Sequence, residues 1–370
     1  MTTTQETLII RQAVPADVPA LATAIGRIDE ETQFLGKPGE FHARWAKGFA
    51  DRLRAFAEKG TGAYVLALNR SEIVGFLGAF AGPFERTRGV IYIAHVGIRE
   101  AWRGHGVGTK LFVAIEDWAR AQGAWRLDLR VDEENARGLA LYHKRGFVSE
   151  GRIVDGANIE GDWRNHLLMA KVLQPFAEPA WPPTDLLPSA SPVRPSAPVF
   201  RRPQVEDAAM LRRFELALLR EIPLLLKQAD EVLDEAGIAK MLAEDLAHAD
   251  RFALAAVAAS PAGEEVVGYA SAWREPSSRM HHDAYLNVAV RRDRGGRGIG
   301  QALAAQAEEW ARAQGLHRLT AFALAQNTRS IRFATALGFR QETLSRNFTL
   351  VDGRTVDRLR MVKRLGEGSP

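Results

Sequence analysis

The chain has 370 residues, which is long for one domain and suits two domains of roughly 150–200 residues each. Apolar residues make up 46% and charged residues 25%, as in ordinary soluble globular proteins, and the net charge of +4 is small for this length. The basic residues form no concentrated stripe, which disfavours nucleic-acid binding, and the lack of cysteine excludes disulfides, thiolate metal sites and a cysteine nucleophile.

The first residues, 1–11, show no charged leader followed by an apolar run, so no signal peptide is predicted. No stretch approaches the ~18 apolar residues that a membrane-spanning helix needs. We therefore expect a cytoplasmic protein that has neither a membrane nor a nucleic acid as a partner.

Apolar periodicity in the first half of the chain predicts strands that alternate with helices. Helices are predicted over 17–28, 41–59, 107–122 and 135–145. Strands are predicted over 8–11, 64–68, 73–79, 90–98, 125–131, 147–154 and 166–172. This order indicates an α/β fold in which helices flank a mixed sheet.

The chain contains an internal repeat at a spacing of 192 residues. The sequence WARAQG at 118–123 recurs at 310–315, and 19 of the 52 positions from 96 to 147 are identical in the second copy. Two copies with a long period indicate a duplicated domain. In the second copy we predict helices over 206–220, 232–246, 299–314 and 327–336, and strands at 200 and over 252–258, 266–273, 285–290 and 319–324.

A proline-rich segment separates the two copies. Eight prolines lie within 174–198, a density that prevents regular helix or sheet and favours an extended spacer. We predict an N-terminal domain over 1–174, a linker over 175–198 and a C-terminal domain over 199–370.

The most informative residues are three alternating glycines, Gly104, Gly106 and Gly108, between a predicted strand and a predicted helix. Glycines let the backbone approach a ligand closely, and the positive end of a helix suits a phosphate. The spacing fits neither the G-x-G-x-x-G dinucleotide motif nor the G-x-x-x-x-G-K-[ST] P-loop. The pattern present is R-x-x-G-x-G, which begins at Arg103.

This pattern resembles the acyl-CoA pyrophosphate loop of the GNAT acetyltransferase superfamily. The resemblance extends to Asn135 at the start of a helix, to Tyr142 within it and to Gly146-Phe147 at the next strand. It covers nearly the whole of both copies and implies two tandem GNAT domains. It also implies transfer of an acetyl group from acetyl-CoA to the amine of a small molecule or peptide.

The resemblance implies two sets of cofactor-binding residues, one in each copy. In the first copy the backbone of the long strand would pair with the pantetheine arm, and the loop would hold the pyrophosphate. This set is Val96, Gly97, Ile98, Arg103, Gly104, His105, Gly106, Val107, Gly108, Thr109, Asn135 and Tyr142. The second set is Val288, Val290, Gly296, Gly298, Gly300 and Asn327. No metal site is predicted.

For catalysis, the resemblance implies that the Tyr142 hydroxyl protonates the leaving thiolate. A base must also deprotonate the amine, and His95 on the long strand and Glu85 before it are the candidates. Glu30 and Glu31, at the end of the first helical region, are candidates to line the acceptor site. A strand bulge is common at this point of the fold, so the sequence does not decide which face His95 takes.

In the second copy Ala334 stands where the first has Tyr142, and Gly295 stands where it has Arg103. The first copy is therefore predicted to be catalytic, and the second to be degenerate, structural or able to bind CoA without turnover. Two alternatives stay open at this point. One is a tandem transferase of the type that makes mycothiol, with an active second copy, and the other is a non-catalytic acyl-CoA sensor or scaffold. The acceptor and the oligomeric state are not readable from these motifs.

Overall fold

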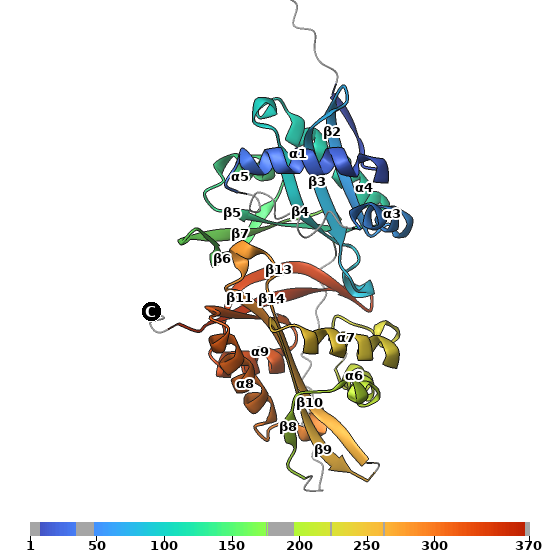
Figure 1. The fold of residues 1–370 in the computed structure, drawn as a ribbon, viewed down its shortest axis with the longest axis vertical. Coiled ribbons are helices and arrows are strands. Elements are labelled where there is room, and N and C mark those ends of the chain that lie inside the picture. Colours follow the sequence, from blue (N-terminus) through green and yellow to red (C-terminus); the bar gives the residue numbers. More distant parts are fainter. Residues whose placement is uncertain are drawn as a thin grey trace, which may run out of the picture. The chain divides into compact units, whose positions relative to one another are not determined.

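In a computed structural model of the chain (Figure 1), the described residues are 8–34, 48–174, 176, 196–222, 224–261 and 263–366. The chain divides into two compact units, Met1–Ala177 and Glu178–Pro370. Most of the predicted linker, 175–198, lies outside the described residues, so its bounds stay a prediction.

The first unit is a mixed sheet with helices on both faces. Its strands are β1 (Leu8–Gln12), β2 (Gly62–Asn69), β3 (Glu72–Ala81), β4 (Val90–Ile98), β5 (Arg126–Asp132), β6 (Val148–Ile159) and β7 (Asp162–Val172). Their order is β1-β2-β3-β4-β5-β7-β6, and only the pair β4 and β5 is parallel among these described strands. The helices are α1 (Val18–Glu30), α3 (Phe49–Lys59), α4 (Val107–Ala121) and α5 (Ala136–Lys144).

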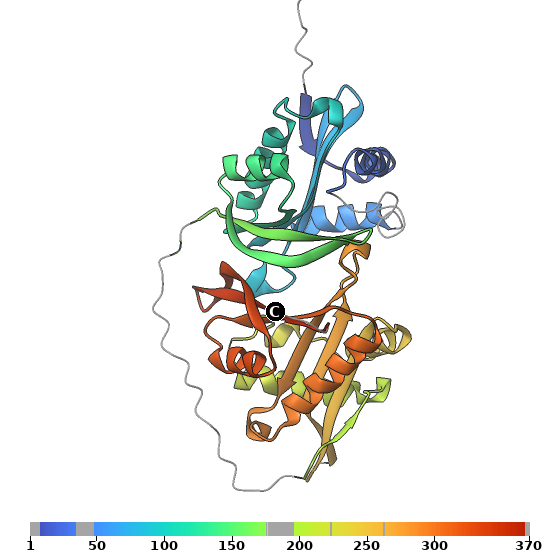
Figure 2. The ribbon, with the colours of Figure 1, turned by 90° about the vertical axis from the view of Figure 1, so that its left-hand side faces the viewer.

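Alternating side chains of the strands build two cores on the two faces of this sheet. On β2, Val65 and Ala67 pack with α4, whereas Tyr64 and Leu66 pack with α1 and α3. Figure 2 shows α4 and α5 on one side of the sheet and α1 and α3 on the other. This confirms the predicted α/β class and most of the predicted elements. Part of the predicted helix 41–59 lies outside the described residues, which resume at 48.

The second unit repeats this architecture. Its strands are β8 (Val199–Arg201), β9 (Arg251–Ser260), β10 (Gly263–Arg274), β11 (Asp283–Val290), β12 (Arg318–Leu324), β13 (Arg340–Val351) and β14 (Arg354–Arg364). Their order is β8-β9-β10-β11-β12-β14-β13, with β11 and β12 parallel. The helices are α6 (Ala208–Glu221), α7 (Glu235–Ala247), α8 (Ile299–Ala313) and α9 (Thr328–Ala336).

The duplication extends to individual ion pairs. Glu116 on α4 pairs with Lys171 at 2.7 Å, and the matching residues on α8 and β14, Glu308 and Lys363, pair at 2.6 Å. Each pair joins a helix to a strand of its own sheet. The repeat therefore preserves interactions between elements as well as the elements themselves.

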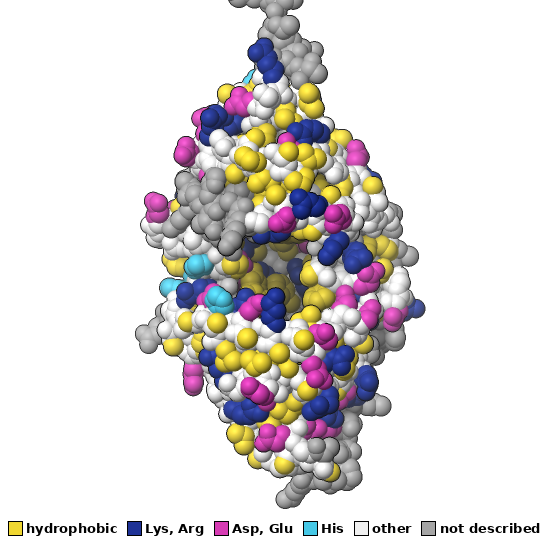
Figure 3. Space-filling view, turned by 45° about the vertical axis from the view of Figure 1, so that its right-hand side comes forward, with side chains coloured by type: hydrophobic (Ala, Val, Ile, Leu, Met, Phe, Trp, Pro, Cys, Tyr) yellow, Lys and Arg dark blue, Asp and Glu magenta, His cyan; other side chains and the backbone are white. Residues whose placement is uncertain are grey.

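None of the helices in the described ranges is long and apolar enough to cross a membrane. On the face drawn in Figure 3, Lys and Arg side chains are interspersed with Asp and Glu, and neither sign forms a continuous block there.

Candidate active site

The glycine loop of the first unit connects β4 to α4, and its glycines serve two different purposes. Gly104 and Gly106 have φ values of 81° and 77°, in the left-handed region that favours glycine. A Cβ at either position would meet no atom within 4 Å, so the space beside them is open. A Cβ at Gly108 would instead lie 2.8 Å from Leu141 of α5, so this glycine is needed for close packing of the two helices.

The backbone amides of this loop point to an anion. Gly106 is the N-cap of α4, and Lys110 N–H donates to Gly106 O in the first turn of the helix. Among the described residues, the N–H groups of 104–109 have no acceptor. These donors, together with the helix dipole, form an environment that suits a phosphate.

The strands beside the loop separate. β4 pairs with β5 from Val90 to Ile93, but β4 continues to Ile98 without a further β5 partner. On the other edge of β4, Arg99 N–H donates to Val74 O. In an antiparallel pair, successive residues alternate between pointing their N–H and C=O groups toward the partner strand and away from it. The N–H and C=O groups of Val96 and Ile98 therefore point away from β3. These groups therefore face the separation between β4 and β5. The Ile98 carbonyl accepts from Arg103 Nε there, so an extended ligand can pair with the N–H and C=O of Val96 and the N–H of Ile98.

Arg103 and His105 are placed differently from the glycines. The Arg103 guanidinium donates from Nε to Ile98 O at 3.1 Å and from its terminal nitrogen to Glu31 O at 3.2 Å. His105 is exposed, and its Nδ1 lies 3.0 Å from Arg103 O. Arg103 thus ties the loop to β4 and to the end of α1, which was not anticipated from the sequence.

Tyr142 lies in the core between the sheet and helices α4 and α5. Its ring centroid is 5.6 Å from that of Phe112 and 6.1 Å from that of Phe147, and 8% of the residue is exposed. Burial raises the pKa of Tyr142 to about 12, so the phenol keeps its proton at neutral pH. In the described part of the chain its hydroxyl has no hydrogen-bond partner.

Asn135 is the N-cap of α5. Its side-chain oxygen accepts a hydrogen bond from Gly138 N–H at 2.9 Å, and Asn327 does the same for Ser330 N–H in α9 at 3.1 Å. Both asparagines precede their helices and do not belong to them, because an N-cap residue has a non-helical backbone.

The position of His95 depends on a bulge in β4. The register with β3 shifts between His95 and Ile93, so Ala94 is an extra residue in the strand. As a result Ile93 and Val96 both face α4, while His95 faces the core of α1 and α3 and lies 3.1 Å from the Tyr64 hydroxyl. His95 and Tyr142 therefore lie on opposite faces of the sheet.

Glu85 lies in a short helical turn before β4, where its carboxylate is 3.4 Å from Arg88. Both side chains are about 60% exposed. Glu85 is thus largely exposed in a turn, whereas His95 lies within β4 beside the Tyr64 hydroxyl, which makes His95 the better placed of these two base candidates.

The second unit keeps the loop but not the side chains beside it. Gly296 and Gly298 have φ values of 74° and 79°, and a Cβ at Gly300 would lie 3.0 Å from Phe333 of α9. β11 pairs with β12 only as far as Tyr285. The N–H and C=O groups of Val288 and Val290 face that separation by the same alternation as in β4.

The residues at the two candidate catalytic positions differ. Asn287 on β11 has the strand register that His95 has on β4. Ala334 on α9 matches Tyr142 on α5 at the repeat spacing of 192. In addition, β11 pairs with β10 without a bulge, so the extra residue Ala94 has no counterpart. Gly295 leaves room for the guanidinium of Arg329, which comes within 2.1 Å of where a Cβ would stand.

A family model for the acetyltransferase (GNAT) family matches residues 29–147 and again 223–339, once in each unit and over more than half of the chain. The chain belongs to the GNAT acetyltransferase family. The tandem GNAT architecture expected from the repeat is thereby confirmed.

Several GNAT relatives are similar to parts of the chain. A mycothiol acetyltransferase of Jonesia denitrificans is 37% identical over 92 residues, which are 25% of this chain and 28% of that protein. An L-methionine sulfoximine/L-methionine sulfone acetyltransferase of Pseudomonas aeruginosa is 41% identical over 93 residues, 25% of this chain and 54% of that protein. The chain thus spans between about a quarter and about half of the length of these relatives.

Among solved structures, a GNAT acetyltransferase of Streptococcus pneumoniae is 29% identical with a TM-score of 0.43, covering 45% of this chain and all of that one. A putative acetyltransferase of Salmonella typhimurium, solved with its cofactor acetyl-CoA, is 20% identical with a TM-score of 0.42 and covers 47% of this chain and 98% of that one.

Glu31 was a candidate to line the acceptor site, and in the structure it holds the start of the glycine loop of this GNAT site. Glu31, the C-cap of α1, accepts hydrogen bonds from Arg99 Nε at 2.7 Å and from Glu100 N–H at the start of the loop. In the second unit Glu221 accepts from Arg292 N–H at 2.7 Å and lies 3.6 Å from Arg291. A carboxylate at the end of the first helix therefore fixes the loop in both units.

Desolvation raises the pKa of Glu31, but the hydrogen bonds from Arg99 and Glu100 and the charges of Arg99 and Arg103 outweigh it, so its pKa lies below the ordinary value. In the sequence, Glu221 matches Glu31 at a spacing of 190 residues. A comparison of the two copies at the constant spacing of 192 does not align these two glutamates.

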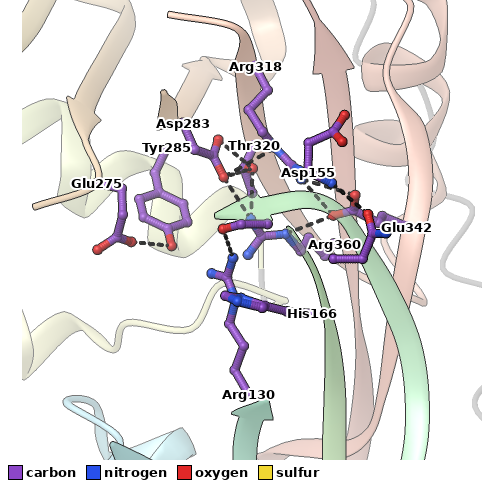
Figure 4. Close-up of polar contacts among 12 residues, drawn as sticks. Arg130, Asp155, His166, Glu275, Asp283, Tyr285, Arg318, Thr320, Glu342 and Arg360 are labelled. Carbon is purple, nitrogen blue, oxygen red and sulfur yellow. Dashed lines mark hydrogen bonds and ion pairs between the residues drawn. The ribbon is translucent and has the colours of Figure 1, made fainter. Parts of the chain in front are cut away.

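Each sheet contains a network of buried charged side chains on its C-terminal strands. In the first unit, fully buried Arg126 lies 2.5 Å from Asp128 and donates to Glu150. In the second unit the matching pair is Arg318 and Glu342 (Figure 4).

In the second unit two further charged residues complete the network. Arg360 donates to Asp283 at 2.8 Å, and the Thr320 hydroxyl donates to the same carboxylate at 2.9 Å (Figure 4). Asp283 is thus fully engaged by arginine and threonine. Among the described residues no group of three or more His, Asp or Glu could hold a metal ion.

Proposed function

We propose that this protein transfers an acetyl group from acetyl-CoA to a primary amine of a small molecule or peptide, and that the first unit carries out the reaction. The observation that carries the proposal is the first unit's combination of an open glycine loop, a separated strand pair and hydroxyl and imidazole groups on the two faces of the sheet.

The residues present fit acetyl-CoA. The unpaired N–H groups of 104–109 and the open space beside Gly104 and Gly106 suit the pyrophosphate. The N–H and C=O of Val96 and the N–H of Ile98 suit the amide groups of the pantetheine arm. Acetyl-CoA, when bound, supplies the acetyl group as a thioester that an amine can attack.

The chain's own groups then have three tasks. His95 takes a proton from the acceptor ammonium, because only a neutral amine attacks a carbonyl. A backbone N–H that faces the strand separation, at Val96 or Ile98, stabilises the charge that develops on the carbonyl oxygen. The Tyr142 Oη keeps its proton at neutral pH. A group that donates a proton or a hydrogen bond to a leaving thiolate needs such a proton.

The raised pKa of Tyr142 bears on the last task. A thiol is a stronger acid than a phenol with a pKa of about 12, so full proton transfer to the thiolate is uphill. Tyr142 therefore acts chiefly by donating a hydrogen bond to the sulfur, with the final proton coming from solvent.

A second candidate places the chemistry in the second unit, as expected for a mycothiol-type transferase. The 92-residue similarity to a mycothiol acetyltransferase is the reason to consider it. Ala334 and Asn287 disfavour it, because neither side chain can act as the acid or the base. We therefore assign the second unit a cofactor-binding or structural role.

The proposal is tested by incubating the protein with acetyl-CoA and separate panels of amino acids, amino sugars, polyamines and peptides. Because the chain has no cysteine, a thiol reagent detects released CoA without background from the protein. We expect one panel to give CoA and an acetylated product in equal amounts. Tight binding of acetyl-CoA with no product from any panel would instead support the sensor alternative.

A further inference from the structure

Tyr64, Gly78 and His95 form a row across three neighbouring strands. Tyr64 on β2 is the register partner of Gly78 on β3, and Gly78 is the register partner of His95 on β4. The Tyr64 hydroxyl lies 3.1 Å from Nδ1 of His95. The tyrosine ring thus crosses β3 to reach the histidine two strands away.

Gly78 makes this crossing possible. A Cβ at Gly78 would lie 2.6 Å from two ring carbons of Tyr64 and 3.0 Å from its hydroxyl oxygen. Its φ is not in the left-handed region, so the requirement is for space and not for an unusual backbone. Any side chain at this position would push the Tyr64 ring away from His95.

The surroundings of Tyr64 hold its ring in one place. The residue is 1% exposed, and its ring meets those of Phe49 at 5.2 Å and Phe80 at 5.9 Å, each edge to face. Burial raises the pKa of Tyr64 above its ordinary range, and the charge of Arg52 on α3 only partly opposes this. The hydroxyl is therefore neutral and can donate to or accept from an imidazole nitrogen.

The second unit lacks this row. The corresponding register positions are occupied by Ala253, Ser271 and Asn287. All three members of the row are therefore replaced together in the unit that also lacks the tyrosine of α5. The row is therefore present in the unit that carries the candidate catalytic residues and absent from the unit that lacks them.

We infer that Tyr64 is a positioning residue for His95: its hydroxyl oxygen accepts a hydrogen bond from Nδ1–H and so keeps the lone pair of the imidazole on Nε2. The inference rests on the proposed function, in which His95 is the base. Nε2 takes one proton from the acceptor ammonium and becomes part of an imidazolium, which then returns the proton to water. The tyrosine neither gains nor loses a proton in this step.

The variant that tests the inference is Tyr64→Phe, which removes the hydroxyl and keeps the ring. We expect kcat to fall about tenfold or more, because a general base contributes about 10²–10⁴-fold and depends on its orientation. The KM for acetyl-CoA should not change, and the Tm should fall by only about 2–4 °C, because a single hydrogen bond is lost. The matched control is Tyr269→Phe in the second unit, which removes a buried hydroxyl that has no hydrogen-bond partner among the described residues and should leave kcat unchanged.

A double-mutant cycle shows whether Tyr64 acts through His95. In a His95→Gln background, Tyr64→Phe should have no further effect on kcat, since there is no imidazole left to orient. If Tyr64→Phe retains full kcat while His95→Gln loses it, or if the two losses simply add, the inference is wrong.

Nitrogen NMR of ¹⁵N-histidine-labelled protein tests the pair without any turnover. The wild-type spectrum should show His95, assigned with His95→Gln, as the Nδ1–H tautomer, and Tyr64→Phe should shift it toward the other tautomer. A wild-type His95 in the Nε2–H tautomer would overturn the inference. If no amine is acetylated but the tautomer is as expected, the proposed function fails and the pairing stands.

Discussion

Glu31 accepts a hydrogen bond from Arg99 at 2.7 Å and so joins the end of α1 to the residue that precedes the glycine loop. Replacing Glu31 with glutamine removes the charge and keeps the shape. We expect the KM for acetyl-CoA to rise about two- to fivefold, as for a partly exposed ion pair worth about 0.4–1 kcal/mol. The matched variant Glu221→Gln in the second unit should leave this KM unchanged. Equal effects of the two variants would contradict the assignment of turnover to the first unit.

The same carboxylate gives the first unit a defined pH dependence. Because the folded pKa of Glu31 lies below its unfolded value, its charge stabilises the fold at pH values above the unfolded pKa. This contribution is lost as the pH falls through the folded pKa. The difference in unfolding free energy between wild type and Glu31→Gln should therefore be constant near neutral pH and shrink below about pH 4. Urea titrations at several pH values measure it, and a difference that grows in acid would be inconsistent with the ion pair.

Tyr142→Phe tests the hydroxyl on α5. The phenylalanine ring keeps the contacts with Phe112 and Phe147, so the Tm should stay the same or rise slightly. We expect kcat to fall about tenfold or more while the KM for acetyl-CoA stays near the wild-type value, because the hydroxyl acts on the leaving sulfur. Steady-state kinetics with the best amine would show this, and an unchanged kcat would remove the hydroxyl from the mechanism.

Arg126→Met tests the buried charge network of the first sheet. Arg126 is fully buried, and its loss leaves Asp128 and Glu150 as buried carboxylates without their guanidinium partner. Breaking such a network typically costs about 3–5 kcal/mol. Hydrogen exchange of the β5 amides reports this loss within the first unit alone.

The control for this variant is Arg54→Met, which breaks a helix ion pair whose arginine is 58% exposed. It should change stability by less than about 0.5 kcal/mol. Similar exchange rates in the two variants would mean that the buried network contributes little.

The sequence predicted the order of strands and helices because the apolar runs are long and strongly periodic. It also placed the glycine loop between a strand and a helix, because left-handed residues before a helix are commonly glycine. Arg126 shows the limit of this approach. Polar and apolar residues alternate along β5 as they would in a half-exposed strand, yet the polar face is covered and Arg126 is buried.

The face of His95 could not be assigned because it depends on one extra residue. The apolar positions Ile91 and Ile93 are odd, whereas Val96 and Ile98 are even, and this change of parity is the local signal of the bulge. The Tyr64–His95 pair and the Glu31–Arg99 pair join residues 31 and 68 positions apart. No local pattern encodes such contacts, because they arise only when the strands and helices assemble.

The most direct test of the central claim is calorimetric titration of acetyl-CoA, together with turnover, on charge variants of the two loops. Gly106→Asp and Gly298→Asp each place a carboxylate at a helix N-cap, where aspartate tolerates the left-handed backbone and a Cβ would meet no atom closer than 4.0 Å. The uncharged controls are Gly106→Asn and Gly298→Asn, so that the Asp-to-Asn difference isolates the charge. We expect Gly106→Asp to lose acetyl-CoA binding to the first unit and all turnover, while Gly298→Asp keeps turnover. Turnover that survives Gly106→Asp but is abolished by Gly298→Asp would contradict the account and place catalysis in the second unit.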